Sequence, residues 1–418
     1  MTFNPQQVIF VRMFTRVIEQ TIRRACRTFP AVLVTGPRQS GKTTLLRMGW
    51  GATHRLLSLE NPDLRARALS DPVGFLRDNP PPVILDEIQY APELLAYIKT
   101  RIDAKRRPGQ WLLPGSQHCP IMQGVGQSLA GRVAVLTLLP CSLDEIGGHS
   151  KKAGSIKYLL ESIFNGNCCA PRPDFGLDAW LLRGAYPELW ANAAVDRDLW
   201  CASYIQTYLE RDVRQLLNIG DLNSFARFLR LLAARTGQLL NYSDLGRDAG
   251  VSAPTARKWA SVLEASGQIY LLPPYFKNFG KRLIKSSKIY FLDTGLATFL
   301  TGLHSREPIM RGPFIGSLLE TAIVSSWVKT FYHRGLPPPL YFWRSRDGLE
   351  IDLVIEYDGR LYPIEIKATA TVTPHHAAGL RKWNELTGAN ETAGIIMANI
   401  DGPMSVAPGI RAVPWWWV

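Results

Sequence analysis

The stretch VTGPRQSGKTTLL, residues 34–46, decides the fold of the first part of this chain. It follows the apolar run 31–35 and contains the spacing Gly-x-x-x-x-Gly-Lys-Thr from Gly36 to Thr43. Glycines let backbone N–H groups approach phosphates, and the helix that follows adds partial positive charge at its N-terminus. The stretch therefore predicts a strand, a phosphate-binding loop and a helix at the start of a parallel α/β sheet.

The side chains of this loop have predicted roles in holding ATP. Lys42 would neutralise the β- and γ-phosphates, and Thr43 would offer a hydroxyl to Mg²⁺. Arg38 is a further candidate for phosphate contact. The nucleotide-binding residues expected from the loop are Gly36, Pro37, Arg38, Gln39, Ser40, Gly41, Lys42, Thr43 and Thr44.

Two further buried strands should end beside the loop. PPVILDEIQ, residues 81–89, ends in Asp86, which would hold Mg²⁺ through its water shell, and Glu87, which would polarise the attacking water. WLLPGSQ, residues 111–117, ends in Ser116, a candidate γ-phosphate sensor or a simple loop start. The paired carboxylates favour hydrolysis over nucleotide binding alone.

SLAGRVAVL, residues 128–136, places Arg132 between a glycine and a predicted strand. An arginine there could reach the nucleotide of a neighbouring subunit as a catalytic finger, or it could be an ordinary surface side chain. The first alternative requires a homo-oligomer, for example a hexameric ring.

The middle of the chain has the pattern of a winged helix-turn-helix. Residues 225–276 predict a helix ending near Gly237, a second over 242–249, a third over 253–265 capped by Ser252, and a β-wing. The third helix of such a unit commonly enters a DNA groove. Its candidate contacts are Thr255, Arg257 and Lys258.

Basic residues favour DNA as the partner. The chain carries 48 Lys and Arg against 35 Asp and Glu, a net charge of +13. The predicted wing, YFKNFGKRLIKSSKIY, mixes aromatic residues with cations that suit phosphate contact. These cations are Lys277, Lys281, Arg282, Lys285 and Lys288. Winged helices also dock proteins, so that alternative stays open.

The C-terminal part carries a possible metal site. EIDLVIEYDGRLYPIEIKAT, residues 350–369, predicts two strands joined by an Asp-Gly turn. Asp352 lies on the first strand, and Glu365 and Lys367 share one face of the second. With Glu320 on a preceding helix, these carboxylates could bind Mg²⁺ while Lys367 positions or activates water for phosphodiester cleavage.

Other functional classes find no support in the sequence. The six cysteines form no CxxC motif and have no companion histidine, so neither a zinc site nor a disulfide framework is expected. No apolar run approaches the roughly 20 residues needed to span a bilayer. We expect no membrane contact and a reducing, cytoplasmic location.

Several motifs resemble one protein family in the same order along the chain. TGPRQSGKTTLL, ILDEIQ, GSQ, LAGRV and RGAYPE are similar to those of predicted bacterial and archaeal AAA-type ATPases with a C-terminal domain of unknown function of the restriction-endonuclease-like type. YLERDVRQL, KIYFLDTGLA, GSLLETAIVSSWV and YFWRSRDGLEIDLVI extend the resemblance over nearly the whole chain. Pro114 departs from it, because we expect Thr at this position.

The resemblance implies a fold of four parts. They are an AAA-type P-loop NTPase core over 1–145, a loop-rich insertion and helical lid over 146–220, a winged helix-turn-helix over 221–283, and a restriction-endonuclease-like α/β domain over 284–418. The last resembles the PD-(D/E)XK nucleases, whose four motif positions match Glu320, Asp352, Glu365 and Lys367.

The sequence thus predicts an ATPase that uses ATP and Mg²⁺ to bind and remodel DNA, with branched DNA as one candidate substrate. Lys42, Glu87 and Arg132 would serve ATP hydrolysis, and Asp352, Glu365 and Lys367 would serve DNA cleavage. Two alternatives remain open: a DNA motor whose C-terminal domain does not cleave, and an ATP-controlled switch that docks a protein.

Overall fold

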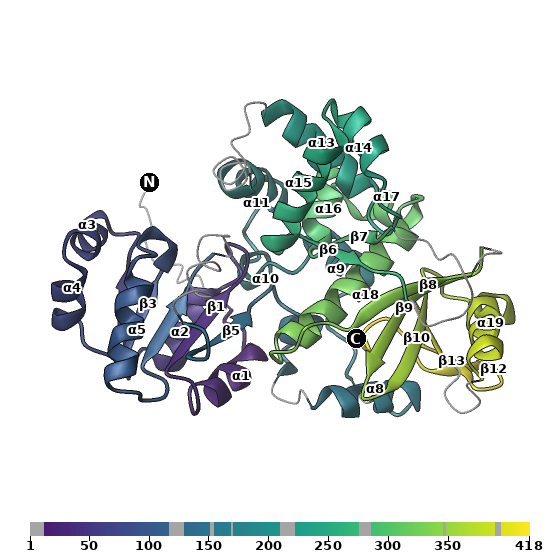
Figure 1. Cartoon of the computed structure of the whole chain (residues 1–418). Coiled ribbons are helices and arrows are strands. Elements are labelled where there is room, and N and C mark those ends of the chain that lie inside the picture. Colours follow the sequence, from purple (N-terminus) through teal and green to yellow (C-terminus); the bar gives the residue numbers. More distant parts are fainter. Residues whose placement is uncertain are drawn as a thin grey trace, which may run out of the picture.

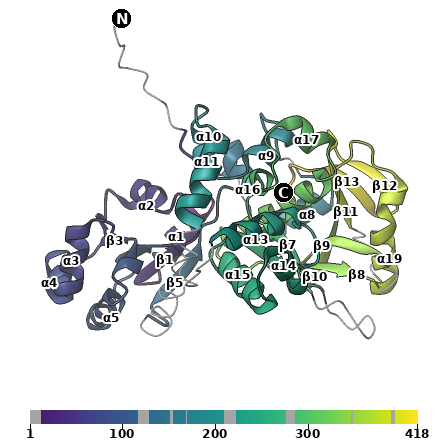
Figure 2. The same ribbon diagram turned by 90° about the horizontal axis from the view of Figure 1, so that it is seen from above.

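A computed structural model describes residues 12–116, 129–150, 154–168, 170–209, 222–275, 286–345, 348–388 and 394–418. Two sheets lie at opposite ends of the molecule, and a group of helices lies between them (Figures 1 and 2). None of the described helices is both long and apolar enough to cross a membrane.

The N-terminal unit, called the ATPase unit below, is built on a five-stranded parallel sheet with the order β2–β3–β4–β1–β5. Its strands are β1 (Ala31–Thr35), β2 (Arg55–Ser58), β3 (Val83–Asp86), β4 (Trp111–Pro114) and β5 (Val133–Thr137). Its helices are α1 (Ile18–Ala25), α2 (Lys42–Trp50), α3 (Pro62–Ser70), α4 (Pro72–Asp78), the 3₁₀ turn η1 (Ile88–Tyr90) and α5 (Leu94–Ala104).

The central strands β1, β3 and β4 of this sheet are buried on both faces. Ala31 and Leu33 of β1 pack into one apolar cluster, whereas Val32 and Val34 pack into another, because successive side chains of a strand point to opposite faces. Parallel sheets covered on both faces are typical of α/β proteins. The predicted parallel α/β sheet is therefore confirmed.

Short helices follow the sheet. They are α7 (Leu143–Gly147), α8 (Ile156–Phe164), α9 (Leu177–Arg183), α10 (Pro187–Ala191), α11 (Arg197–Tyr204) and the π-helical turn η3 (Ile205–Leu209). The sequence predicts a loop-rich insertion here, but it contains α8, whose N-terminus is capped by Ser155. This helix forms because Ile156, Leu160 and Ile163 recur on one face and are buried.

A three-helix unit comes next. It consists of α13 (Leu222–Ala234), α14 (Tyr242–Ala249) and α15 (Ala253–Ala265), followed by the antiparallel pair β6 (Ile269–Leu272) and β7 (Lys288–Phe291). The predicted helices over 242–249 and 253–265 have the predicted bounds, and Ser252 caps the second through the Thr255 N–H. The β6–β7 pair spans the predicted domain boundary between residues 283 and 284.

The C-terminal unit contains a six-stranded mixed sheet with the order β12–β13–β11–β10–β9–β8. Its strands are β8 (Leu340–Arg344), β9 (Glu350–Tyr357), β10 (Arg360–Lys367), β11 (Ile395–Ala398), β12 (Met404–Ala407) and β13 (Ile410–Pro414). Its helices are α16 (Thr294–Leu300), α17 (Arg306–Arg311), α18 (Ile315–Tyr332), the 3₁₀ turn η4 (Pro374–Ala377) and α19 (Ala378–Thr387). The predicted β9–β10 hairpin is present, with positive φ at Asp358 and Gly359.

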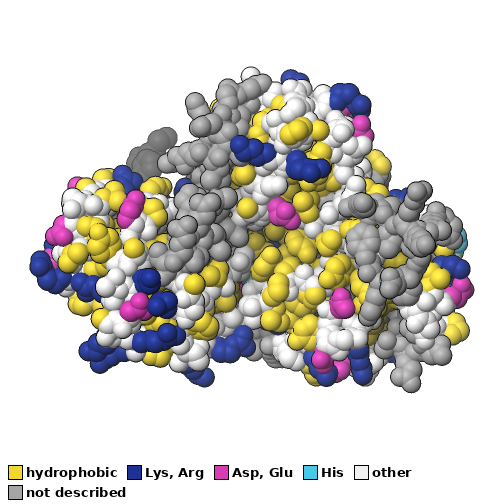
Figure 3. All heavy atoms as spheres, viewed as in Figure 1, with side chains coloured by type: hydrophobic (Ala, Val, Ile, Leu, Met, Phe, Trp, Pro, Cys, Tyr) yellow, Lys and Arg dark blue, Asp and Glu magenta, His cyan; other side chains and the backbone are white. Residues whose placement is uncertain are grey.

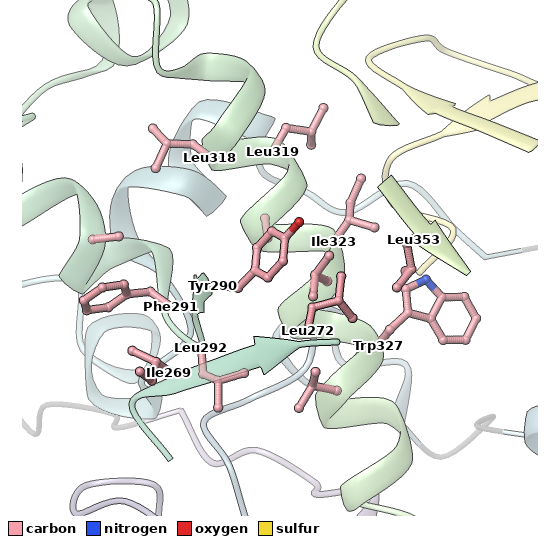
Figure 4. Close-up of a cluster of buried hydrophobic side chains, with 14 of the residues drawn as sticks. Ile269, Leu272, Tyr290, Phe291, Leu292, Leu318, Leu319, Ile323, Trp327 and Leu353 are labelled. Atoms are coloured by element: carbon pink, nitrogen blue, oxygen red, sulfur yellow. The ribbon is translucent and has the colours of Figure 1, made fainter. Parts of the chain in front are cut away.

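Helix α18 is the centre of the largest apolar core. Its residues Leu319, Ile323 and Trp327 lie between the β6–β7 pair and Leu353 of the C-terminal sheet (Figure 4). Thirteen of its 18 residues are buried, so the helix is enclosed by the protein on nearly every side. It therefore holds the three-helix unit and the C-terminal sheet together.

Replacing Trp327 with Ala should destabilise the protein by about 3–5 kcal/mol, because this fully buried side chain would leave a cavity. Leu199→Ala is the control: this side chain is 68% exposed, and its loss should cost less than about 0.5 kcal/mol. Urea unfolding measures both. Equal stability of the two variants would contradict the central position of α18.

Candidate functional site

The phosphate loop has the backbone that an anion site needs. Gly36 has φ +142°, and a Cβ there would lie 2.0 Å from the Leu138 carbonyl oxygen, so no other residue fits without a shift. Gly41, with φ +92°, caps the N-terminus of α2. The Lys42 ammonium donates to the carbonyls of Gly36 (3.0 Å) and Pro37 (2.9 Å). The loop is thus folded around the lysine that would meet the phosphates.

The predicted magnesium ligands of the ATPase unit lie together. The Thr43 hydroxyl donates to Asp86 Oδ1 at 2.9 Å, because α2 begins and β3 ends at the same edge of the parallel sheet. Burial raises the pKa of Asp86 to about 6, and the neighbouring Glu87 adds to the rise, while the Thr43 hydrogen bond opposes it. A hydroxyl beside a partly desolvated carboxylate is a donor set that suits Mg²⁺.

Glu87 and Ser116 are joined by a residue that the sequence analysis did not single out. Gln89 Nε2 donates to a Glu87 carboxylate oxygen and to the Ser116 hydroxyl, the latter at 2.9 Å. Glu87 itself has φ +54°, in the left-handed region that non-glycine residues rarely adopt. Gln89 therefore fixes the direction of both side chains.

A cavity of about 730 Å³ opens beside the loop. Its lining combines polar and charged residues, among them Arg38, Lys42, Thr43 and Glu87, with apolar residues, among them Phe14, Leu45, Met48 and Pro187. This volume and this mixed lining suit a nucleoside triphosphate.

Arg132 lies apart from this cavity. It precedes β5 and so lies at the end of the sheet where the parallel strands begin, whereas the phosphate loop follows the opposite end of β1. Its guanidinium binds both carboxylate oxygens of Asp103, at 2.6 and 3.1 Å. It therefore does not contribute to the nucleotide site of its own chain. A role at a neighbouring subunit's nucleotide stays a prediction.

The C-terminal unit brings together the four residues predicted from its motif. Lys367 Nζ lies 2.5 Å from Glu365 Oε1 and 3.7 Å from Asp352 Oδ2, and the Ile366 N–H donates to the same Asp352 oxygen at 2.7 Å. Burial raises the pKa of Glu365, and Asp352 adds to the rise. Burial also raises the pKa of Glu320, and again Asp352 adds to it. The three carboxylates thus repel one another in a buried place.

Lys288 corrects one prediction. The sequence analysis assigned it to DNA contact, but it is only 4% exposed, and its ammonium binds Glu320 at 2.8 Å and also contacts Glu350. Burial alone would lower the pKa of Lys288, but Glu320, Asp352 and Glu350 raise it. The Tyr290 hydroxyl donates to Glu320 as well. Lys288, Tyr290 and Glu350 are therefore members of the cluster that the sequence analysis did not place there.

The fit of this cluster to a metal ion has one point in favour and one against. Glu365 Oε2 is buried and has no hydrogen-bond partner, an arrangement that a bound cation would satisfy. Among the described residues, however, no group of three or more His, Cys, Asp or Glu is arranged to hold a metal ion. The ammonium groups of Lys288 and Lys367 neutralise the carboxylates of Glu320 and Glu365, as a metal ion would.

The predicted DNA-contact residues have different surroundings. Arg257 and Lys258 are exposed on α15, and Arg257 also stacks on the Tyr242 ring at 5.1 Å. The Thr255 hydroxyl is instead 2.8 Å from that of Ser252, so it completes the helix cap. Outside the described residues lie the wing cations Lys277, Lys281, Arg282 and Lys285. Figure 3 shows Lys and Arg side chains on the three-helix unit and along the rim of the ATPase unit.

Comparison with known proteins identifies relatives that match most of the chain. Residues 28–147 match the AAA domain family, and residues 175–307 and 315–418 each match a domain of unknown function (DUF8612 and DUF4143). "Uncharacterized protein Rv2008c" of Mycobacterium tuberculosis and "Uncharacterized protein Mb2031c" of Mycobacterium bovis are each 33% identical over 351 residues, which cover 84% of this chain and 73% of theirs.

Two solved structures are more distant matches. The Walker-type ATPase PABY2304 of Pyrococcus abyssi is 16% identical with a TM-score of 0.38, and the match covers 68% of this chain and 94% of that one. The RuvB Holliday junction branch migration motor of Thermotoga maritima is 16% identical with a TM-score of 0.27, and the match covers 61% and 89%.

Replacing Asp86 with Asn should stabilise the nucleotide-free protein at pH 8. Folding raises the pKa of this carboxyl to about 6 from an unfolded value near 4. Ionisation of Asp86 therefore destabilises the folded state. This destabilisation increases as the pH rises from about 4 to about 6 and has its full size above about 6. We expect a gain of about 1–2 kcal/mol at pH 8 that shrinks at pH 5.

Urea unfolding at both pH values measures this gain. Exposed Asp174 provides the control, since Asp174→Asn removes the same charge without relieving burial. An Asp86→Asn protein no more stable than the parent at pH 8 would show that the carboxylate is not strained by burial.

Proposed function

The chain belongs to the family of AAA-type ATPases that includes the mycobacterial protein Rv2008c, and on this premise we propose that it hydrolyses ATP to bind and remodel DNA. The observation that carries the ATPase part is the 2.9 Å contact between Thr43 and Asp86 beside the Lys42 loop. This contact joins the two motifs that hold Mg²⁺ and triphosphate in P-loop enzymes.

The residues around the loop have different roles in the proposed ATP hydrolysis. Lys42 would exchange its loop carbonyls for the β- and γ-phosphate oxygens, while the backbone N–H groups of the loop orient the triphosphate. Thr43 and Asp86 would hold Mg²⁺, which neutralises charge on the phosphates when bound. Glu87, whose carboxylate is oriented by Gln89, would accept a proton from the attacking water. Ser116, which accepts a hydrogen bond from the same Gln89 side chain, would contact the γ-phosphate and so sense its presence.

The DNA part of the proposal rests on the three-helix unit. Helix α15 follows a capped turn after α14, and a two-stranded sheet follows it, which is the element order of a winged helix. Arg257 and Lys258 are exposed on this helix, where their charges are available to phosphates. Assembly into a ring, with Arg132 reaching a neighbouring nucleotide, completes this proposal.

The C-terminal cluster supplies a second activity to test, which is metal-dependent DNA cleavage. Glu320, Asp352 and Glu365 would hold Mg²⁺, and Lys367 would position the attacking water. The unpartnered Glu365 oxygen favours this role, and the lysines that already neutralise the cluster favour the alternative, a C-terminal unit that grips DNA without cutting it.

Removing both Arg257 and Lys258 should weaken DNA binding about tenfold at moderate salt, because two phosphate contacts and their released counterions are lost. The slope of the logarithm of the DNA-binding constant against the logarithm of salt concentration is negative, and its magnitude should decrease by about two. Fluorescence anisotropy with linear, supercoiled and four-way-junction DNA measures both quantities. ATP hydrolysis in the same mixtures identifies the DNA form that the protein acts on.

Arg67→Ala is the control for this experiment. It removes a cation from α3 of the ATPase unit, where Arg67 pairs with Asp78, and should leave DNA affinity unchanged. A parent protein that binds no DNA at low salt and is stimulated by no DNA form would instead favour the switch that docks a protein.

Replacing Lys367 with Ala should abolish Mg²⁺-dependent nicking of supercoiled DNA, since the ammonium that touches both Glu365 and Asp352 is lost. Lys382→Ala is the control, because that lysine pairs with Glu385 on the exposed face of α19 and should not affect cleavage. Gel electrophoresis measures the products. A parent protein that cleaves no form of DNA would leave the non-cleaving motor as the better account.

A further inference from the structure

Arg16 belongs to no motif, yet it touches the phosphate loop. It precedes α1, and its side chain is 5% exposed. Its guanidinium donates to the Ser40 carbonyl of the loop at 2.7 Å, to the Leu139 carbonyl at 2.6 Å, and to Glu145 Oε2 at 2.9 Å. The planar, forked guanidinium suits three fixed acceptors at once. Arg16 therefore holds the backbone of the loop from outside.

Glu145 connects Arg16 to other parts of the chain. Its carboxylate is fully buried and accepts the N–H groups of Val17 (2.7 Å) and Ser142 (2.8 Å). Its Oε1 also lies 3.3 Å from His333 Nδ1. Burial alone would raise the pKa of Glu145, but Arg16 and His333 hold it well below its usual range. The carboxylate thus stays charged and keeps its neighbours in place.

His333 brings the C-terminal unit into this cluster. It is the C-cap residue of α18, and its carbonyl accepts the Thr21 hydroxyl at 3.0 Å. The same helix carries Glu320 of the carboxylate cluster, 13 positions earlier, or about 20 Å along the axis. One buried helix therefore contacts the Arg16–Glu145 cluster at its C-terminal end and the carboxylate cluster near its start. Figure 1 shows the position of α18 in the molecule.

A second polar link reaches the same loop. The Tyr204 hydroxyl donates to the Arg38 carbonyl at 3.5 Å, and Gln268 Nε2, next to β6, donates to Tyr204 at 3.0 Å. Two carbonyls of the phosphate loop are thus held by hydrogen bonds that lead to segments far outside the ATPase sheet. The loop geometry depends on contacts beyond the AAA domain.

We propose that Arg16 is a positioning residue for ATP, and that Arg16, Glu145 and His333 couple the phosphate loop to α18. The inference rests on the proposed ATP binding. When the triphosphate fixes the loop, the Ser40 carbonyl fixes the position of the Arg16 guanidinium. Glu145, which contacts both Arg16 and His333, then transmits this shift in position to His333 and α18. Because coupling free energy is reciprocal, the position of α18 also affects nucleotide affinity.

Two variants separate the two parts of this proposal. Arg16→Lys keeps the charge but loses the planar, forked donor geometry that reaches the three separate acceptors, so affinity for a non-hydrolysable ATP analogue with Mg²⁺ should fall about tenfold. His333→Leu keeps the buried volume but breaks the contact with Glu145, so binding should stay within about threefold while the effect on α18 is lost. Arg334→Lys is the control, since the Arg334 guanidinium donates to the Thr330 and Gly154 carbonyls, away from the loop.

Hydrogen exchange of the full chain, with and without the analogue, reports the coupling. In the parent protein, peptides covering Glu320 to His333 should exchange more slowly by severalfold when nucleotide is bound, whereas peptides of α19 should not change. The difference should disappear in His333→Leu and persist in Arg334→Lys. A purely structural ion pair would not give this pattern.

The outcomes distinguish this inference from the function on which it rests. A parent protein that binds no nucleotide contradicts the proposed ATPase. A parent protein that binds nucleotide with no change in α18 exchange overturns the coupling, even if Arg16→Lys fails to fold. A folded Arg16→Lys protein with unchanged affinity overturns the positioning role.

Discussion

The hydrogen bond between Thr43 and Asp86 depends on a constraint of parallel sheets. Strands β1, β4 and β3 are neighbours that run in one direction, so the loop after β1 and the end of β3 meet at the same edge. Burial of the strands on both faces fixes their register, and the register fixes the two side chains. The cavity, Glu87 and its partner Gln89 are all arranged around this contact.

Helix α18 has a comparable role in the second half of the chain. Its apolar side chains are buried against the β6–β7 pair and the C-terminal sheet, so the two parts share one core through this helix. Near its two ends, Glu320 meets Lys288 and His333 meets Glu145. Charged groups buried in this way are costly unless they are paired. Lys288 pairs with Glu320 near one end, and Arg16 pairs with Glu145 beside the other. One helix therefore contacts two buried charged clusters.

The sequence predicted those features whose residues lie close together along the chain. The phosphate loop, the Asp86 strand, the capped helices of the middle unit and the β9–β10 hairpin each have a local signature, and each is present. Lys288 was misassigned because its partner Glu320 lies 32 residues away, and only the fold turns its side chain inward. Gln89 was missed for a similar reason, since Ser116 lies 27 residues away. Arg16 and Glu145, 129 residues apart, have no pattern that a local reading could detect.

The most direct measurement of the account is calorimetric titration of the purified chain with ATP and Mg²⁺, together with phosphate release, for the parent and for Lys42→Ala. The account predicts saturable binding and turnover by the parent and loss of both in the variant, because Lys42 is the ammonium around which the loop is folded. A parent protein that neither binds nor hydrolyses nucleotide, or a variant that does so equally well, would contradict it.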